Sequence, residues 1–213
     1  MFESATEIHP PLRFPTPVRG LDAIIYERNI AYLHESGYMI VGDELFDLST
    51  NKSVTNTLVE KALSQRIGCL DLTAAFTIGN GPIQIIELSS PCQENSRRLH
   101  HHLSQPHHAA NLTRHIFFHI DPCDPRSNSY VRRILSDPDN LEMLENIYMG
   151  HMDTWPAHEI YVPSETLSQH DAACRTLGLR NLPCIYSDGN YLSGYHPAHT
   201  DRLLKKLHDA RRL

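Results

Sequence analysis

The chain has 213 residues, 40% of them hydrophobic, and a formal net charge of −6 at pH 7. This length and composition suffice for one large domain or two small ones with cores of their own. The acidic balance and the scattered Lys and Arg argue against a basic face for a phosphate backbone, so we expect no nucleic acid among the partners. No apolar run approaches the ~20 residues of a membrane-spanning helix.

The start of the chain lacks the basic stretch and apolar core of a signal peptide. We therefore expect either a cytosolic protein or the mature form of an exported one. Five cysteines are present, none of them paired at Cys-x-x-Cys spacing, which argues against a zinc ribbon and leaves at least one thiol unpaired in a monomer. They are Cys69, Cys92, Cys123, Cys174 and Cys184.

Short strands separated by turns are predicted in the first fifty residues, and they form a small antiparallel meander. The predicted strands are 23–26, 30–33, 38–41 and 44–48. From Val54 the apolar residues follow helical spacing, which predicts a helix to about Arg66 with Thr57 and Glu60 as a capping box. We interpret this helix as a rigid linker.

A β-α-β unit is predicted next. The β-branched run Ile83–Leu88 is typical of a fully buried strand; it is followed by Cys92 and a polar helix, and then by a second strand over His115–Ile120. This order makes the two strands parallel, with a right-handed crossover.

The remaining third alternates helices with a terminal hairpin. Helices are predicted over 131–135, 141–148 and 164–177; a strand opens over 181–186, turns at 187–190 and returns, and a helix over 201–212 closes the chain. The predicted fold class is therefore α+β.

Several stretches of the sequence carry the pattern of a known family. They are Pro17–Leu21, the meander ending at Phe46-Asp47-Leu48, the helix from Val54, Cys92-Gln93-Glu94-Asn95, Leu177-Gly178-Leu179, Leu182-Pro183, Ser187-Asp188-Gly189 and Gly194-Tyr195-His196-Pro197. In these stretches the sequence resembles the DsbC/DsbG-type disulfide isomerases, a periplasmic family with a thioredoxin fold. The resemblance extends over nearly the whole chain from about residue 15.

The resemblance implies a cystatin-like N-terminal dimerisation domain (1–52), a linker helix and hinge (53–78), and a thioredoxin-like domain (79–213) with a helical insertion at about 126–180. It also implies a homodimer joined through the N-terminal domain, location in the periplasm, and a membrane thiol reductase as electron donor. Leu182 and Pro183 are implied to form a cis-proline loop that docks substrate.

Cys92 is the predicted catalytic residue. The family begins its active-site helix with Cys-x-x-Cys, whereas Asn95 occupies the resolving position here. A thiol at a helix N-terminus faces the positive end of the helix dipole, which favours the thiolate, although Glu94 opposes this effect. One thiolate suffices for isomerisation, because a substrate thiol can release it. Cys123 and Cys184 are expected at the same sheet edge and are candidate second thiols.

Other residue clusters are interpreted as structural. We expect Cys69 and Cys174 to be core residues. The histidines at 100–102 and 107–108 lack metal-ligand spacing, so we interpret them as a solvated helix end and predict no metal site and no cofactor.

Two functions remain open. The favoured one is a DsbC-like monothiol disulfide isomerase and chaperone that acts on unfolded or misoxidised exported proteins through Cys92. The alternative is a redox-inactive thioredoxin-fold binding module or chaperone for a secretion or conjugation apparatus.

Overall fold

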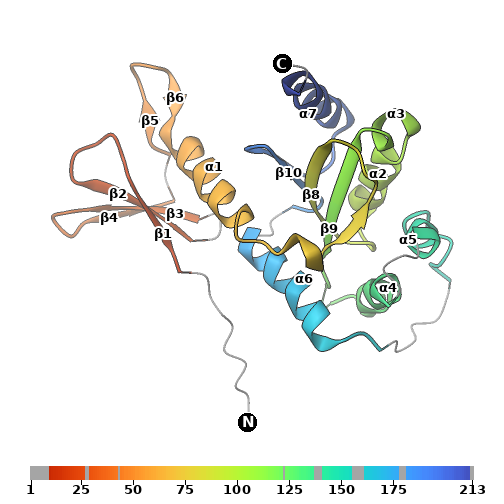
Figure 1. Cartoon of the computed structure of the whole chain (residues 1–213). Helices are drawn as coiled ribbons and strands as arrows, with labels where there is room; N and C mark the ends of the chain where they lie inside the picture. The colour runs from red at the N-terminus through yellow and green to blue at the C-terminus, as the bar shows by residue number, and fades with distance from the viewer. Residues whose placement is uncertain are drawn as a thin grey trace, which may run out of the picture. The chain divides into compact units, whose positions relative to one another are not determined.

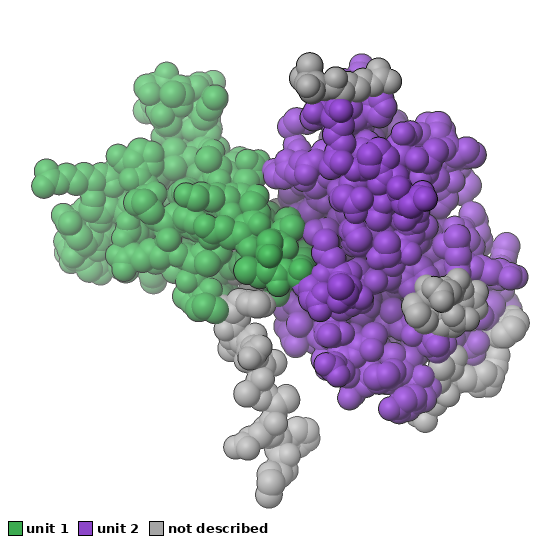
Figure 2. All heavy atoms as spheres, viewed as in Figure 1, with its two compact units in different colours: residues 1–70, 176–178 green, residues 71–175, 179–213 purple. Residues whose placement is uncertain are grey.

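The computed structural model describes residues 10–26, 29–42, 44–121, 123–136, 141–154, 161–177 and 181–211. The chain forms two compact units (Figure 2): residues 1–70 with 176–178, and residues 71–175 with 179–213. Several predicted ranges extend beyond the described residues: Gly178-Leu179 of the family resemblance, Arg212 of the predicted terminal helix, and parts of the predicted N-terminal domain and helical insertion. No helix among the described residues has the length and apolar character needed to cross a bilayer.

Unit 1 is a four-stranded antiparallel sheet covered by one helix (Figure 1). The sheet has the order β1-β2-β3-β4, so three of its strands are those predicted from the sequence. The fourth predicted strand, 44–48, does not join it: β5 pairs with β6 in a separate hairpin, and β1 takes the remaining place. The elements are β1 (Leu12–Pro15), β2 (Leu21–Tyr26), β3 (Asn29–His34), β4 (Met39–Val41), β5 (Phe46–Asp47), β6 (Lys52–Ser53) and α1 (Val54–Ile67).

Helix α1 starts where the sequence predicts, but its cap differs from the prediction. The Ser53 side chain accepts a hydrogen bond from the Asn56 amide, so Ser53 is the N-cap and the predicted capping box is wrong. Leu58 and Ala62 are buried in one cluster with Ile25 of the sheet. Helix α1 is therefore packed into unit 1 along its apolar face.

Unit 2 contains a five-stranded mixed sheet with helices on both faces. Its strand order is β11-β10-β8-β9-β7. The elements are the 3-10 helix η1 (Leu72–Ala74), β7 (Phe76–Ile78), β8 (Ile83–Ser89), α2 (Glu94–Leu103), α3 (Pro106–Ala109), β9 (Leu112–Phe118), α4 (Pro125–Leu135), α5 (Leu141–Tyr148), α6 (Ser164–Leu177), β10 (Cys184–Ser187), β11 (Asn190–Ser193) and α7 (Pro197–Ala210). The last two residues of α6 are assigned to unit 1.

The centre of this sheet confirms the predicted topology. β8 runs parallel to β9 and antiparallel to β10. An edge strand, β7, pairs antiparallel with β9 and was missed because its three residues give no period to detect. Gly79 follows β7 with a φ of +80°, and a Cβ there would lie 2.3 Å from the Leu112 carbonyl oxygen, so this close turn into β8 requires glycine.

Two apolar clusters lie next to each other on one face of the sheet. Side chains of α4 and α5, including Ile134 and Ile147, pack on Phe118, and Leu99 of α2 and Leu204 of α7 cluster with β8. The strand register places both clusters on the same side, whereas Phe117 on the other side contacts His170 of α6. The fold is thus an α+β chain with an N-terminal antiparallel sheet and a C-terminal mixed sheet with helices, as predicted.

A chain of buried polar groups ties β8, β9, α2 and α5 together. Both Nε and Nη2 of Arg114 donate to Glu87 Oε2, at 3.1 and 2.8 Å, and both residues are almost fully buried. Nη2 of Arg114 also donates to His100 Nδ1 at 3.2 Å, and His100 Nε2 donates to Glu145 at 3.0 Å. Burial lowers the pKa of His100, in agreement with this neutral tautomer.

Removing Arg114 should therefore destabilise unit 2 strongly. Arg114→Ala leaves the Glu87 carboxylate buried without its partner, and we expect a loss of about 3–5 kcal/mol in the free energy of unfolding, measured by urea denaturation. The double variant Glu87→Met/Arg114→Leu should lose clearly less free energy of unfolding than Arg114→Ala, because neither charge then remains buried alone. As a matched control, Arg175→Ala removes an exposed ion pair with Asp171 and should change stability by about 0.5 kcal/mol or less. An Arg114→Ala protein as stable as this control would contradict the assigned role.

Candidate functional site

Cys92 lies in the turn between β8 and α2, at the carboxyl end of the central strand. The N-cap of α2 is Gln93, so Cys92 precedes the cap by one residue and is not in the first helical turn. Its side chain is half-buried and packs against the apolar cluster formed by β9, α4 and α5. This placement differs from the predicted thiol at the helix N-terminus.

The surroundings of Cys92 disfavour a thiolate. Burial, followed by the nearby Asp124 carboxylate, raises the pKa of Cys92 to about 11, although Arg126 and Arg97 partly oppose the shift. The Asp124 side chain lies close enough to the thiol to favour its protonated form. The protonated thiol therefore predominates at neutral pH. The prediction that the helix dipole favours a reactive thiolate is corrected by these two effects.

The cation closest in sequence to Cys92 is already committed to other partners. The guanidinium of Arg97 donates from Nη1 and Nη2 to the two carboxylate oxygens of Asp153, each at 2.7 Å, and from Nε to the Pro91 carbonyl at 2.8 Å. The Asp153 carboxylate offsets much of its charge. Arg97 therefore gives the sulfur little help in ionising.

Cys123 is exposed on the loop after β9, next to the residue that contacts Cys92. Its neighbour Asp124 is the N-cap of α4 and accepts from the Arg126 amide at 2.9 Å. The Cys123 amide donates to Asp121 at 2.8 Å. The structure thus brings the loop that carries Cys123 up to Cys92.

Cys184 is held in a different environment. It opens β10 opposite Leu88 and is fully buried. Its thiol donates to the Asn181 carbonyl at 3.1 Å and lies 3.5 Å from the Tyr191 hydroxyl oxygen. All five cysteines are free thiols; Cys174 is buried as predicted, whereas Cys69 is exposed, contrary to its interpretation as a core residue.

The peptide bond between Leu182 and Pro183 is cis, as the resemblance implied. Pro183 is buried and its carbonyl accepts from the Gly194 amide at 2.8 Å, which fastens the loop to the end of β11. Leu182 is only half-buried. Within the described part of the chain, its backbone N–H and C=O form no hydrogen bond.

Leu182 lines an open pocket of about 400 Å³ together with Asn95, the residue in the lost resolving position. The remaining lining residues come from the start of α2, the cis-proline loop and the segment from β11 into α7: Gln93, Asn181, Leu192, Ser193, Gly194, Tyr195, His196 and His199. We call this pocket the docking groove. Asn95 and Leu182 therefore line one pocket, whereas Cys92, beside which the docking loop was expected, packs against the α4 side.

Sequence reasoning missed the residues that control Cys92. Asp124 and Asp153 lie 32 and 61 positions away from it in the chain. The one available signal was Asp124-Pro125, a typical helix start, which places a carboxylate at the end of the neighbouring strand.

The pH dependence of Cys92 alkylation tests these electrostatics. In the native wild-type chain, the rate should rise about tenfold per pH unit up to about pH 11, because only the thiolate reacts. Asp124→Asn keeps the N-cap but removes the negative charge, so the profile should move to lower pH; Arg126→Ala should move it higher. Exposed Cys69 is the internal reference, with labelled sites identified by mass spectrometry. Half-maximal Cys92 labelling at or below pH 8.5 in the wild type would rule out this description.

No protein-family model matches the sequence, and no curated protein matches it. Solved structures do. The thiol-disulfide exchange protein alpha-DsbA2 from Wolbachia pipientis matches with a TM-score of 0.54 and 10% identity, over 73% of this chain and 99% of that one. The disulfide interchange protein from Neisseria gonorrhoeae matches with a TM-score of 0.51 and 20% identity, over 64% of this chain and 97% of that one. The catalytic domain of Proteus mirabilis ScsC matches with a TM-score of 0.50 and 13% identity, over 70% of this chain and 97% of that one. The chain therefore has the thioredoxin fold and distantly resembles thiol-disulfide oxidoreductases in structure.

Proposed function

We propose that this chain is a DsbC-like chaperone that binds extended segments of unfolded exported proteins in the docking groove, with the Cys92 thiol kept protonated. This is the redox-inactive alternative of the two functions above. The proposal includes the periplasm as its location and, as clients, exported proteins such as the components of a secretion or conjugation apparatus.

The observation that carries the proposal is the backbone of Leu182. Its N–H and C=O are free of hydrogen bonds within the described residues, and its side chain lines the docking groove. An extended peptide can pair with such a backbone as an added strand, while its side chains contact the groove beside it. Asn95 lines the same groove and offers an amide to a further main-chain group.

The state of Cys92 supports binding over redox chemistry. A thiol with a pKa near 11 is a poor nucleophile at neutral pH, and Asn95 cannot resolve a mixed disulfide. Neither feature affects peptide docking at Leu182. The groove can therefore function without the thiol.

Monothiol isomerisation remains the second candidate, favoured by the position of Cys92 at the carboxyl end of β8 and by the nearby loop of Cys123. In this reaction the Cys92 thiolate attacks a substrate disulfide, forms a mixed disulfide and releases one substrate thiolate. A second substrate thiolate then displaces Cys92, so no net oxidation occurs. If Cys123 displaced the substrate instead, a Cys92–Cys123 disulfide would form, and a thiol reductase would have to reduce it.

A binding assay and a disulfide assay separate these functions. The probe for binding is a fluorescein-labelled, extended ten-residue apolar peptide, followed by anisotropy. Leu182→Asp should weaken its binding roughly tenfold, because a charge replaces an apolar contact worth about 1.5 kcal/mol. Leu141→Asp, at an exposed position of α5, is the matched control and should bind like the wild type. Cys92→Ser should also bind like the wild type.

Reactivation of scrambled ribonuclease supplies the second readout. The binding proposal predicts that wild type and Cys92→Ser reactivate the enzyme at the same rate as buffer with equal free thiol. Reactivation that depends on Cys92 would contradict the binding proposal and favour the isomerase. If Leu182→Asp bound the peptide as tightly as the wild type, the docking groove would have no part in either function.

An exposed apolar edge in unit 1 supports the homodimer. β4 is an outer strand of its sheet, and Met39, Ile40 and Val41 are 61%, 48% and 68% exposed. An unpaired apolar edge of this kind invites pairing with another strand. Pairing β4 with the same strand of a second copy gives a self-complementary two-fold interface.

A charge on β4 should therefore break the dimer. We expect twice the mass of one chain for the wild type at micromolar concentration by light scattering, and monomers for Val41→Lys, because a lysine on an edge strand opposes strand pairing. Val18→Lys, at an exposed apolar site in the β1–β2 turn, should remain dimeric. A monomeric wild type, or a dimeric Val41→Lys protein, would contradict this interface.

A further inference from the structure

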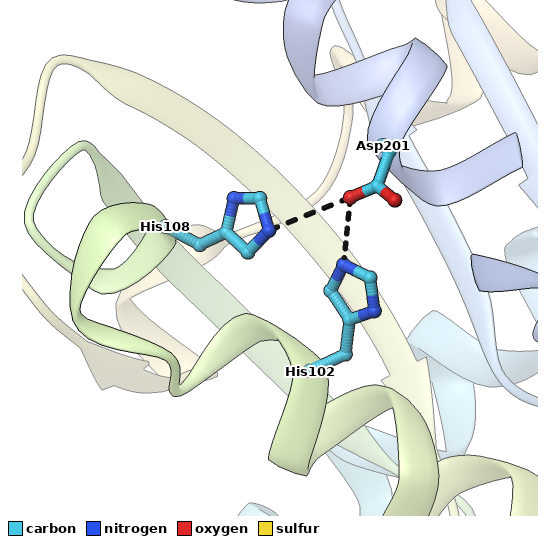
Figure 3. Close-up of side chains that lie close together, drawn as sticks. All are labelled: His102, His108 and Asp201. Atoms are coloured by element: carbon cyan, nitrogen blue, oxygen red, sulfur yellow. Dashed lines mark hydrogen bonds and ion pairs between the residues drawn. The ribbon is translucent and has the colours of Figure 1, made fainter. Parts of the chain in front are cut away.

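Three side chains from separate segments converge away from Cys92 and outside the proposed chemistry. His102 lies in the last turn of α2, His108 in α3 and Asp201 in the first half of α7. One nitrogen of each imidazole and one carboxylate oxygen all lie within 4.8 Å of one another. Figure 3 shows both rings turned toward the same oxygen of Asp201.

We propose that His102, His108 and Asp201 form a binding site for a divalent transition-metal ion, with Zn²⁺ as the best-matched species. Two imidazoles and one carboxylate are a ligand set that Zn²⁺ accepts, and three protein ligands leave one tetrahedral position open. Ca²⁺ and Mg²⁺ are disfavoured, because they prefer a cage of oxygen ligands.

The spacing of the ligand atoms fits such an ion. Zn²⁺ holds nitrogen and oxygen ligands at about 2.0–2.2 Å, so neighbouring ligand atoms in a tetrahedron lie about 3.3–3.5 Å apart. His102 Nε2 is 3.0 Å from Asp201 Oδ1, and His108 Nε2 is 3.5 Å from the same oxygen. These separations bracket the required value. The two imidazole nitrogens lie within 4.8 Å of each other, so a bound ion requires the two stacked rings, with centroids 4.9 Å apart, to rotate until these nitrogens reach the same spacing.

An outer hydrogen bond orients the first ligand. His102 Nδ1 lies 3.1 Å from the Tyr195 hydroxyl oxygen, and the two rings meet edge to face. With a metal on Nε2, Nδ1 carries the ring proton and donates it to Tyr195. Histidines that bind metals generally have such a partner, which fixes the tautomer and the ring plane.

The fourth coordination position has access to solvent. A pocket of about 250 Å³ is lined by His108 and Asp201 together with His107 and His208. A water molecule or a small anionic ligand can therefore reach the ion from this pocket. The site would tie the end of α2 to α7, beside Tyr195, which also lines the docking groove.

The same contacts could exist without a metal. In that case both Nε2 atoms carry protons and donate to Asp201, and Tyr195 donates its hydroxyl proton to His102 Nδ1. The two arrangements differ in the proton on each Nε2, which a bound ion replaces. Zinc affinity at this cluster distinguishes them.

The test is a Zn²⁺ titration against a chromophoric chelator, using the full chain without a polyhistidine tag. Cys69 and Cys123 are replaced by serine in every protein, so that exposed thiols do not bind the probe. We expect one Zn²⁺ per chain at micromolar or lower dissociation constant, and at least about tenfold weaker binding in His102→Gln, His108→Gln and Asp201→Asn. His101→Gln is the matched control, since this exposed histidine is adjacent on α2 and outside the cluster.

Two further readouts complete the test. Saturating Zn²⁺ should raise the melting temperature of the parent and of His101→Gln but not of the three ligand variants, because only a folded site gains stability from the ion. Tyr195→Phe keeps the ring contact but loses the outer hydrogen bond, and should bind Zn²⁺ about tenfold more weakly. Unchanged stoichiometry and affinity in the His102→Gln/His108→Gln double variant, or no binding below millimolar Zn²⁺, would overturn the proposal.

Discussion

The parallel pairing of β8 with β9 is the constraint on which the rest of unit 2 depends. Because both strands run the same way, their carboxyl ends meet at one sheet edge, and the turns that follow carry Cys92 and Asp124 to the same place. The antiparallel β10 begins at that edge, which adds the cis-proline loop. The buried ion pair between Glu87 of β8 and Arg114 of β9 links the two strands through their side chains. The candidate site follows from these pairings.

The chemistry at this edge differs from that of a reactive thiol for reasons of position and charge. Cys92 precedes the N-cap of α2, so the helix dipole is less well placed to stabilise its thiolate. Burial and Asp124 both favour the protonated form, and Arg97 is engaged by Asp153. What remains available is the docking groove with the backbone of Leu182, which forms no hydrogen bond to any residue that the structure describes. Peptide binding needs no ionised sulfur, so the two features agree.

Sequence patterns were sufficient where a local rule decides the structure. The β-branched run at 83–88 predicted the central strand, and the order of elements predicted its neighbours. Short segments with no period, such as Phe76–Ile78, escaped detection because register alone makes them strands. Properties that depend on residues far apart in the chain could not be predicted from sequence patterns either. The pKa of Cys92 depends on Asp124, and the His102 cluster needs Asp201, 99 positions away.

The central claim is that the docking groove binds extended polypeptide independently of Cys92. Its most direct test is an NMR titration of the ¹⁵N-labelled chain with an unlabelled extended peptide, for the wild type and for Cys92→Ala. The account predicts shifts in the backbone amides of Leu182, Asn95 and Gly194, with the same dissociation constant in both proteins. Shifts confined to other surfaces, or loss of binding in Cys92→Ala, would contradict it.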